Sequence, residues 1–509
     1  MEAKDQDLMH LENGMEKNLA ALDAQDLQGE LDSLDREMEA VMRKKFDYTI
    51  LPVVTLIYLM AFIDRSNMGN AKIMGMEEDL HLKGYDFNIA LTGFFVTYVL
   101  FEVKELSTDI LWDNFVRPAN VLCKHFGPRV WLSLITLMFG IITLCIAFVD
   151  NKKGLIAARV CLGVAEAGIM PGITYTLSTF YRRHELVTRV GIYASVASVA
   201  GGFGGLLATG FSLIPQWGMV HSWRNIFFFE GVMTIGAAIV CYCALPNSPG
   251  EARFLNKEQQ VLGVRRIQLE ALALATEKMQ KRHFTAAILN FNTWLMSIGL
   301  FCSLLCMNSV ALFMPSLLRA MHFTSIKAQL MTVPPYVLGS IVCISAAITS
   351  DRFKTRGTVL LALACPTIVI GFALLLSVNI IAVKYFALFL VTMGAFTGSP
   401  VFISWTVDNS AGPTVRAIAS GFAVSLGSTG GLVATWTYLP SEAPGYTTGH
   451  IINLCAGIVF FLVTAITTTY LRWENRMRDQ GKRDYRVEGK SEEEIATLGH
   501  SHPAFRYTP

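Results

Sequence analysis

Four ionisable side chains interrupt otherwise apolar stretches in the first half of the sequence. Asp64 and Arg65 are adjacent at the end of one apolar run, and Arg159 and Glu166 lie within a later one. At 3.6 residues per turn, positions 159, 163 and 166 fall on one face of a helix. Gly163, between the two charges, leaves room for a closely packed neighbour.

These residue types can do chemistry together. An ionisable residue inside a membrane-spanning helix costs roughly 2.5–3.5 kcal/mol on insertion scales, and therefore marks a candidate functional site. A carboxylate can bind and release a proton, and an arginine fork matches the geometry of a carboxylate anion. We therefore predict one buried cluster in which a carboxylate exchanges a proton and an arginine holds an anion. The alternative is that the four charges only neutralise one another and hold the helices together.

Other polar and aromatic residues are further candidates. Tyr98 lies in the second apolar run and is a candidate cavity residue, although an aromatic residue at helical spacing more often packs in a core. Trp405 and Asn409 follow a segment interrupted by Gly398 and Pro400. Interrupted helices tend to line substrate cavities in membrane proteins, so these two residues are candidate contacts from the second half.

Two more acidic residues, Glu102 and Glu230, also lie in apolar runs. Both are placed near the end of a run, close to the predicted membrane edge. A structural role is at least as well supported for them as a functional one.

Composition restricts the class of protein that must position these residues. Of 509 residues, 52% are hydrophobic and 16% are charged, whereas about a quarter are charged in soluble proteins. This disfavours a soluble enzyme. Lys plus Arg number 42 and Asp plus Glu 40, so the net charge of +2 predicts no nucleic-acid partner. The ten cysteines show no metal-ligand spacing, and we expect no metal and no cofactor.

The apolar residues are clustered into runs of membrane-spanning length. A bilayer core of about 30 Å requires roughly 20 apolar residues per helix. Two sets of six runs satisfy this, and we predict an all-α membrane protein with twelve transmembrane helices in two six-helix halves. The predicted spans lie near residues 48–66, 87–103, 129–149, 155–180, 189–213, 225–245, 286–314, 327–349, 358–377, 382–404, 415–439 and 450–471.

The polar segments complete the predicted organisation and its orientation. Basic residues concentrate in alternate loops, and such loops stay cytosolic, so both termini are predicted to be cytosolic. The first 46 residues are polar and acidic and do not resemble a signal peptide. The predicted parts are an acidic tail (1–47), a first half (48–245), a cytosolic linker (246–285), a second half (286–472) and a second tail (473–509).

Several motifs in register resemble a known family. They include Phe62–Lys72 (FIDRSNMGNAK), Arg159–Gly172 (RVCLGVAEAGIMPG), the Trp223-Arg224 pair followed by Glu230-Gly231, and Ser350–Arg352. Over residues 43–475 the chain resembles the major facilitator superfamily, and within it the anion:cation symporter family and the allantoate permease group of fungi. The first two motifs are the most specific.

The resemblance implies two halves that rock about a central site and move a small carboxylate together with protons. Members of this group are similar in carrying allantoate, ureidosuccinate, nicotinate, pantothenate, biotin and sugar acids. By analogy, Arg65 is the main anion contact, Asp64 and Glu166 are the proton-coupled carboxylates, and Arg159 is the partner that switches Glu166. The motif of a cytosolic latch between the halves is matched by Asp351, Arg352 and Arg356.

One segment departs from the family pattern. Between Phe101-Glu102-Val103 and Pro118-Ala119-Asn120, the chain interposes residues 104–117, with five charges. Without this segment the second span is unbroken and of bilayer length. The segment is therefore either a gene-model error or a real insertion that extends or breaks the second helix.

Taken together, the sequence predicts a proton-coupled importer of a small organic anion, a monomer in the plasma membrane. Two alternatives remain open, an exporter of a secondary metabolite and a nutrient receptor that binds without transport. An enzyme is disfavoured because no nucleophile, base and orienting group occur together.

Overall fold

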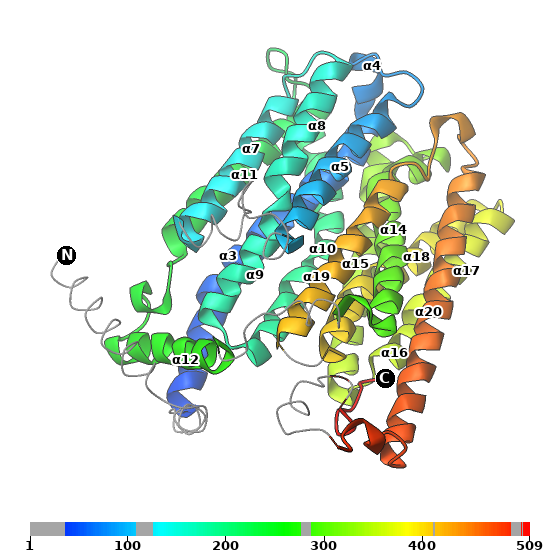
Figure 1. Ribbon diagram of the computed structural model, residues 1–509. Helices are drawn as coiled ribbons and strands as arrows, with labels where there is room; N and C mark the ends of the chain where they lie inside the picture. Colours follow the sequence, from blue (N-terminus) through cyan, green and yellow to red (C-terminus); the bar gives the residue numbers. More distant parts are fainter. Residues whose placement is uncertain (1–35, 108–125, 276–286, 411–412, 490–499, 501) are drawn as a thin grey trace.

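The computed structural model describes residues 36–107, 126–275, 287–410, 413–489, 500 and 502–509. Long helices dominate these residues, and the part of the chain that is described contains only one isolated β-bridge, between Trp217 and Val220. The long helices of the bundle run roughly parallel to a common axis, and α12 lies across that direction (Figure 1).

Six helical segments form the first half of the bundle. They are α3 (Arg36–Ala71), α5 (Asp86–Ser107), α7 (Pro128–Ile146), α8 (Lys152–Ala167) continued by α9 (Ile169–Phe180), α10 (Arg183–Ser212) and α11 (Trp223–Ala244). Short helical turns follow α3 at η1 (Lys72–Met76) and α4 (Glu77–Asp79). The linker contains η2 (Pro249–Glu251) and the helix α12 (Lys257–Ala275).

Six more segments form the second half. They are α14 (Phe291–Ala320), α15 (Ser325–Phe353), α16 (Arg356–Val359) continued through η3 (Leu360–Ala364) by α17 (Cys365–Ser377), α18 (Ile381–Asp408), α19 (Pro413–Ala434) and α20 (Thr447–Asp479). Two further short turns are η4 (Pro440–Glu442) and η5 (Asp484–Arg486).

Ten of these segments, with consecutive helices joined, are long and apolar enough to cross a membrane within the described residues. The apolar part of α19 is shorter, at Ile418–Ala434, and α5 packs between α8 and α19. The predicted all-α membrane fold of two six-helix halves is confirmed. Several helices exceed their predicted spans, and two of them extend into the predicted tails: α3 begins at Arg36, and α20 continues to Asp479.

Local sequence explains where several helices begin. Pro128 and Pro413 stand at the first position of α7 and α19, where proline loses no helical hydrogen bond. Asn151 caps α8, because its side chain accepts a hydrogen bond from the backbone N–H of Gly154 over 2.9 Å. Glu185 in the first turn of α10 accepts from the preceding backbone N–H of Arg182 over 3.1 Å.

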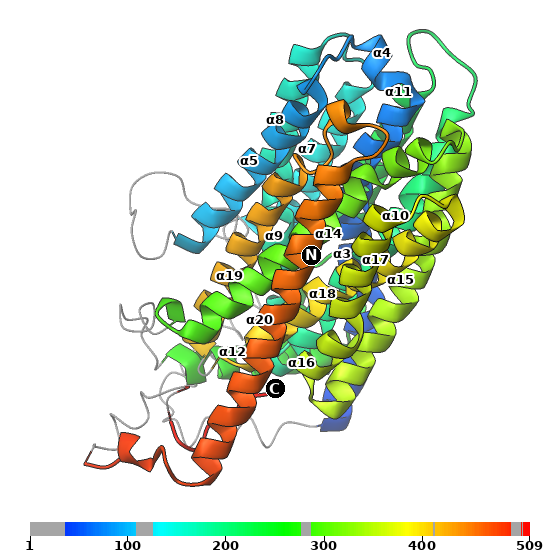
Figure 2. The ribbon, with the colours of Figure 1, turned by 90° about the vertical axis from the view of Figure 1, so that its right-hand side faces the viewer.

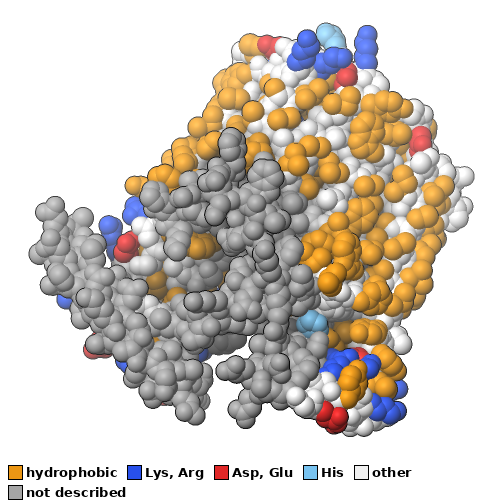
Figure 3. Space-filling view, viewed as in Figure 1, with side chains coloured by type: hydrophobic (Ala, Val, Ile, Leu, Met, Phe, Trp, Pro, Cys, Tyr) orange, Lys and Arg blue, Asp and Glu red, His pale blue; other side chains and the backbone are white. Residues whose placement is uncertain are grey.

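The bundle has two polar ends and an apolar flank. The start of α3, the helix α12 and the end of α20 lie at one end, here called the α12 end, and α4 lies at the other, the α4 end (Figure 1). Charged side chains gather at the two ends of the visible face, while apolar side chains cover the flank between them (Figure 3). This distribution suits a chain surrounded by lipid.

The helix α12 is attached to the first half through Arg266. This side chain is fully buried, donates to the carbonyl of Phe180 over 2.5 Å, and pairs with Glu185 at 3.4 Å and Glu39 at 3.6 Å. Burial lowers the pKa of the Arg266 guanidinium, and the two carboxylates oppose that shift. The linker helix is therefore fixed against the ends of α3 and α10.

The unusual segment at residues 104–117 begins inside α5. The helix continues without a break from Val103 through Ser107. The remainder of the segment, residues 108–117, lies outside the described residues.

Close contact between α5 and α8 depends on Gly163. A Cβ atom at this position would lie 2.2 Å from Thr97 Oγ1 and 2.4 Å from the carbonyl oxygen of Phe94. The Thr97 hydroxyl itself donates to the carbonyl of Val160 on α8 over 3.1 Å. The absence of a side chain therefore sets how near α8 lies to α5.

We predict that Gly163→Ala lowers the melting temperature of the purified protein in detergent. The added methyl group meets backbone of α5 and must push the helices apart, at a cost of about 1–3 kcal/mol. Gly236→Ala is the matched control, because nothing lies within 4 Å of a Cβ atom at that helical glycine. Equal melting temperatures for the two variants would contradict the proposed packing role.

Candidate functional site

A cavity lies between the two halves, at the level of the charged residues. The halves meet along α5 and α19, α10 and α15, and α3 and α14 (Figure 2). The cavity residues used below are Tyr58, Phe62, Arg65, Tyr98 and Glu102 from the first half and Met307, Asn308, Ser399, Ile403 and Ser428 from the second.

The cavity is closed off at the α4 end by contacts between the halves. Asn88 Nδ2 donates to the carbonyl of Thr435 over 2.6 Å, and Gln329 Nε2 donates to that of Asn70 over 3.4 Å. Arg65 precedes Asn70 on α3, which starts at the α12 end. The cavity therefore lies on the α12 side of these contacts.

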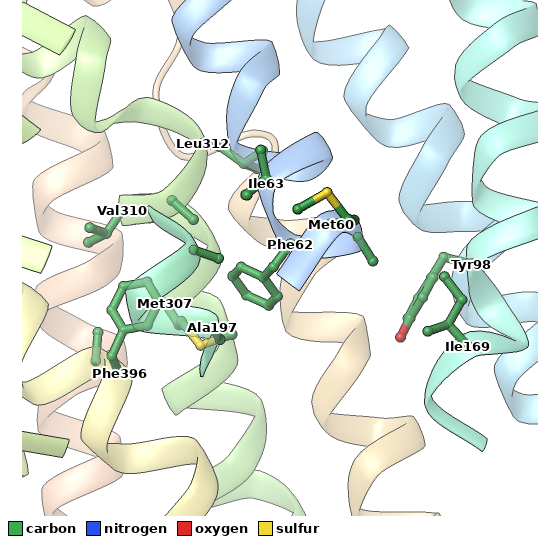
Figure 4. Packing of buried hydrophobic residues seen from close by; sticks show 14 of the residues in the cluster. Met60, Phe62, Ile63, Tyr98, Ile169, Ala197, Met307, Val310, Leu312 and Phe396 are labelled. Carbon is green, nitrogen blue, oxygen red and sulfur yellow. The ribbon is translucent and has the colours of Figure 1, made fainter. Parts of the chain in front are cut away.

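Apolar and aromatic groups form much of the cavity wall. Phe62 of α3 and Met307 of α14 are directed toward each other from opposite halves (Figure 4). Tyr98 of α5 lies on the other side of α3, next to Ile169 (Figure 4). A flat, largely apolar ligand with few polar groups would suit such walls.

Arg65 is the cationic group of the cavity. Its guanidinium carbon lies 4.4 Å from the ring centroid of Tyr98 and 5.4 Å from that of Phe94, so aromatic faces hold it from two residues of α5. Its Nε donates to Glu166 Oε2 over 2.9 Å. The side chain keeps 16% exposure, and its terminal nitrogens supply further donors for an anion.

A second ion pair lies deeper, between Arg159 and Asp64. Arg159 Nη1 is 3.3 Å from Asp64 Oδ2, and both residues are only 1% exposed. Thr143 Oγ1 of α7 donates to Asp64 Oδ1 over 3.1 Å. The four predicted residues are thus brought together, and each ion pair joins α3 to α8. Arg159 pairs with Asp64 and not, as predicted, with Glu166.

Glu230 belongs to the same buried region, although its place in the sequence supported a structural role at least as well as a functional one. Asn67 Nδ2 donates to Glu230 Oε2 over 2.7 Å, and Asn70 Nδ2 donates to Asn67 Oδ1 over 3.1 Å. Glu230 is 2% exposed. Its position within a membrane-spanning helix was the signal that identified it as unusual.

Glu102 is a cavity residue that sequence reasoning did not select. The hydroxyl of Tyr98 donates to Glu102 Oε1 over 3.4 Å, and both residues line the cavity. The signal was available, because residues four apart on a helix share a face and Tyr98 was already a candidate.

Trp405 and Asn409 are placed away from the cavity. Trp405 Nε1 donates to the carbonyl of Thr508 over 2.7 Å, and Asn409 forms a reciprocal pair with the backbone of Thr508 at 3.0 and 2.8 Å. The C-terminal segment therefore satisfies the hydrogen bonds of these two side chains. On the same helix, Ser399 and Ile403, which precede Trp405 by six and two residues, line the cavity.

The predicted latch residues cluster within the second half in this conformation. Arg356 forms an ion pair with Asp351, lies 3.0 Å from Asp408 Oδ2, and donates to Ser350 Oγ over 3.2 Å. Arg352 is exposed. These contacts tie together the ends of α15, α16 and α18 at the α12 end.

Comparisons with known proteins place this architecture in a family. The model of the Major Facilitator Superfamily matches residues 54–435. An uncharacterized transporter of Schizosaccharomyces pombe is 35% identical over 472 residues, 90% of this chain and 88% of the relative. The high-affinity nicotinic acid transporter of Saccharomyces cerevisiae is 32% identical, over 86% of this chain and 79% of that protein.

A solved structure shares the fold. The crystal structure of a D-xylose-proton symporter superposes with a TM-score of 0.62 at 13% identity, covering 83% of this chain and 97% of that one. Family match, relatives and fold agree with the buried charges and the cavity between two six-helix halves. The chain is a multi-pass membrane transporter, not an enzyme, and belongs to the major facilitator superfamily.

Proposed function

We propose that this transporter carries a small organic anion, a carboxylate of the kind handled by the allantoate permease-like group, together with protons. The observation that carries the proposal is Arg65, a guanidinium in the central cavity whose partner Glu166 engages only its Nε edge. A carboxylate is the ligand that best matches the remaining fork. Charge selection at this position would reject neutral solutes.

The cavity walls and a relative support the same class of substrate. The rings of Phe62 and Tyr98 line the cavity beside the Arg65 guanidinium, at 5.8 and 4.4 Å from its central carbon. Such a site suits a flat acid such as nicotinate, and the relative from Saccharomyces cerevisiae is named as a nicotinic acid transporter. Pantothenate and allantoate are further members of the class to be tested.

Proton coupling follows from the competition for Arg65. While Glu166 is ionised it holds Arg65 Nε, and protonation of Glu166 removes that charge and frees the arginine for the substrate. An anion and a proton would then bind together. Asp64 and Arg159 form the second ion pair of the proton-coupled cluster. When the halves rearrange, protonation of a carboxylate changes which acid pairs with which arginine.

The orientation is proposed from the distribution of basic residues. The α12 end carries Arg43, Arg182, Arg189, Arg266 and Arg352, whereas the α4 end carries fewer cations, such as Lys83 and Lys153. The α12 end is then cytosolic, with both termini, and the conformation faces inward. We place the protein as a monomer in the plasma membrane, where the proton gradient drives uptake.

We predict that Arg65→Ala abolishes or severely weakens uptake of labelled nicotinate by cells that express the protein. Loss of a charge-assisted hydrogen bond costs about 1.5–3 kcal/mol, roughly 10- to 100-fold in apparent affinity. Arg65→Lys should recover part of it, because a lysine keeps the charge but not the fork. Arg253→Ala, at an exposed site, is the control. If uptake in the Arg65→Ala variant equals that of wild type, the anion site lies elsewhere.

We predict that Glu166→Gln removes the pH dependence of transport. Wild-type uptake should rise as the external pH falls, because protonation of Glu166 frees Arg65. Glutamine resembles the protonated acid, so Arg65 stays free and binding of nicotinate should become independent of pH. Uptake measured across a pH series, with the exposed Glu258→Gln as control, tests this. A wild-type pH profile in Glu166→Gln would contradict the coupling scheme.

We predict that the two ends of the bundle face opposite sides of the membrane in the proposed sense. Lys153→Cys at the α4 end and Lys354→Cys at the α12 end are both exposed positions. In intact cells, a membrane-impermeant maleimide should label the first variant above the background of the unmodified chain, and the second only after permeabilisation. The reverse pattern would invert the topology.

A further inference from the structure

The buried charges of the first half do not balance. Two ion pairs are each neutral: Arg65 lies 2.9 Å from Glu166, and Arg159 lies 3.3 Å from Asp64. Glu230 is a third carboxylate in the same cluster, and within the described residues no salt bridge is formed by it. If all five groups were ionised, the cluster would carry one excess negative charge inside the bundle.

Glu230 has no ion-pair partner among the described residues that surround it. One carboxyl oxygen accepts from the neutral amide of Asn67 over 2.7 Å, and the other, Oε1, is buried without a hydrogen-bond partner among the described residues. Glu230 and Asn67 line a small second cavity whose other walls are apolar. Those walls are formed by Met60, Ile63, Leu207, Phe211 and Met233.

Few charged groups face Glu230 from the neighbouring helices. The helix α11, which carries Glu230, packs against α3, α7 and α10. Across these contacts α3 brings Asp64 and Asn67, α7 brings Thr143, and α10 brings the apolar Leu207 and Phe211. The remaining charged groups that act on Glu230 are those of α3 and α8, namely Asp64, Arg159 and Glu166.

An ionised carboxylate in this position would be very costly. The effective penalty for an unpaired buried ion is several kcal/mol, and such a group takes up a proton instead of remaining charged. Both arginines already have a carboxylate partner. The least costly state of the cluster is therefore one with a single bound proton, on the acid that has no arginine.

We propose that Glu230 is a further proton-binding residue of this transporter, held in place by Asn67 as a positioning residue. The proposal rests on the proposed proton coupling for its role in transport, but the bound proton itself follows from charge and burial. Two nitrogens of Arg159, Nε and Nη2, are buried and have no hydrogen-bond partner in the described part of the chain. They provide donors for Glu230 when the helices rearrange, so loss of its proton is linked to conformation.

Infrared spectroscopy of the full chain in a detergent without ester groups tests the site without any substrate. A protonated carboxyl group has a C=O stretching band at higher frequency than the bands of a carboxylate or an amide. Wild type at neutral pH should show this band, and Glu230→Gln should lose it or reduce it. Glu102→Gln is the matched control, a second buried acid outside the cluster, and should retain the component that Glu230→Gln lacks. An unchanged spectrum in Glu230→Gln overturns the proposal.

A second variant guards against misfolding of the first. Asn67→Ala keeps the acid but removes the donor to its carbonyl oxygen, so the Glu230 band should remain and shift to higher frequency. A band that neither shifts in Asn67→Ala nor disappears in Glu230→Gln does not belong to Glu230. This readout separates the two proposals: wild type with the band but with pH-independent nicotinate uptake overturns the proton-coupled function and leaves the proton site standing.

The role in transport has its own measurement. Uptake of labelled nicotinate by wild type should increase as external pH falls, and in Glu230→Gln this increase should be lost, because no proton can be exchanged at that position. A Glu230→Gln profile that rises with acidity as wild type does would overturn the role of this residue in coupling.

Discussion

The exclusion of unpaired charge from the interior of a membrane-spanning bundle determines how this structure is arranged. Arg65 and Arg159 can be buried only because Glu166 and Asp64 lie within reach, and each pair joins α3 to α8. Those pairs in turn require α8 to lie close to α5 and α3, which Gly163 permits. The position of Arg65 in the cavity therefore depends on the same helix packing that brings the ion pairs together.

The same constraint is reflected in an uneven distribution of charged groups between the halves. In the cavity, the first half contributes the guanidinium of Arg65 and the carboxyl group of Glu102, whereas the second half contributes neutral groups such as Asn308 and Ser428. Contacts that join the halves at the α4 end include those of uncharged amides with backbone carbonyls and one from a charged side chain, Arg319, which donates to the carbonyl of Ile73 over 2.5 Å. Such contacts can break and reform at modest cost, as rocking about a central site requires.

Sequence alone was sufficient for the class of fold and for the buried cluster, because hydropathy contrast reveals both the spans and the charges inside them. It did not reveal which acid pairs with which arginine, since that depends on the rotation of α3 against α8. Trp405 and Asn409 were predicted to line the cavity, and for a similar reason Ser399 and Ile403 of the same helix line it instead. Which face of α18 meets the cavity depends on tertiary packing, and so does the contact of Thr508 with the end of that helix. Glu230 was underestimated because counting charge requires knowing the partners.

The uneven distribution of charge also bears on how such a protein diversifies. Residues of the second half that face the cavity can be exchanged without disturbing any buried ion pair described here, so they are free to vary under selection for new solutes. The first half is under the opposite pressure, since a single lost partner strands a charge. Proteins descended from a common ancestor would then keep the buried ion pairs of the first half and change their substrate specificity through cavity residues of the second half.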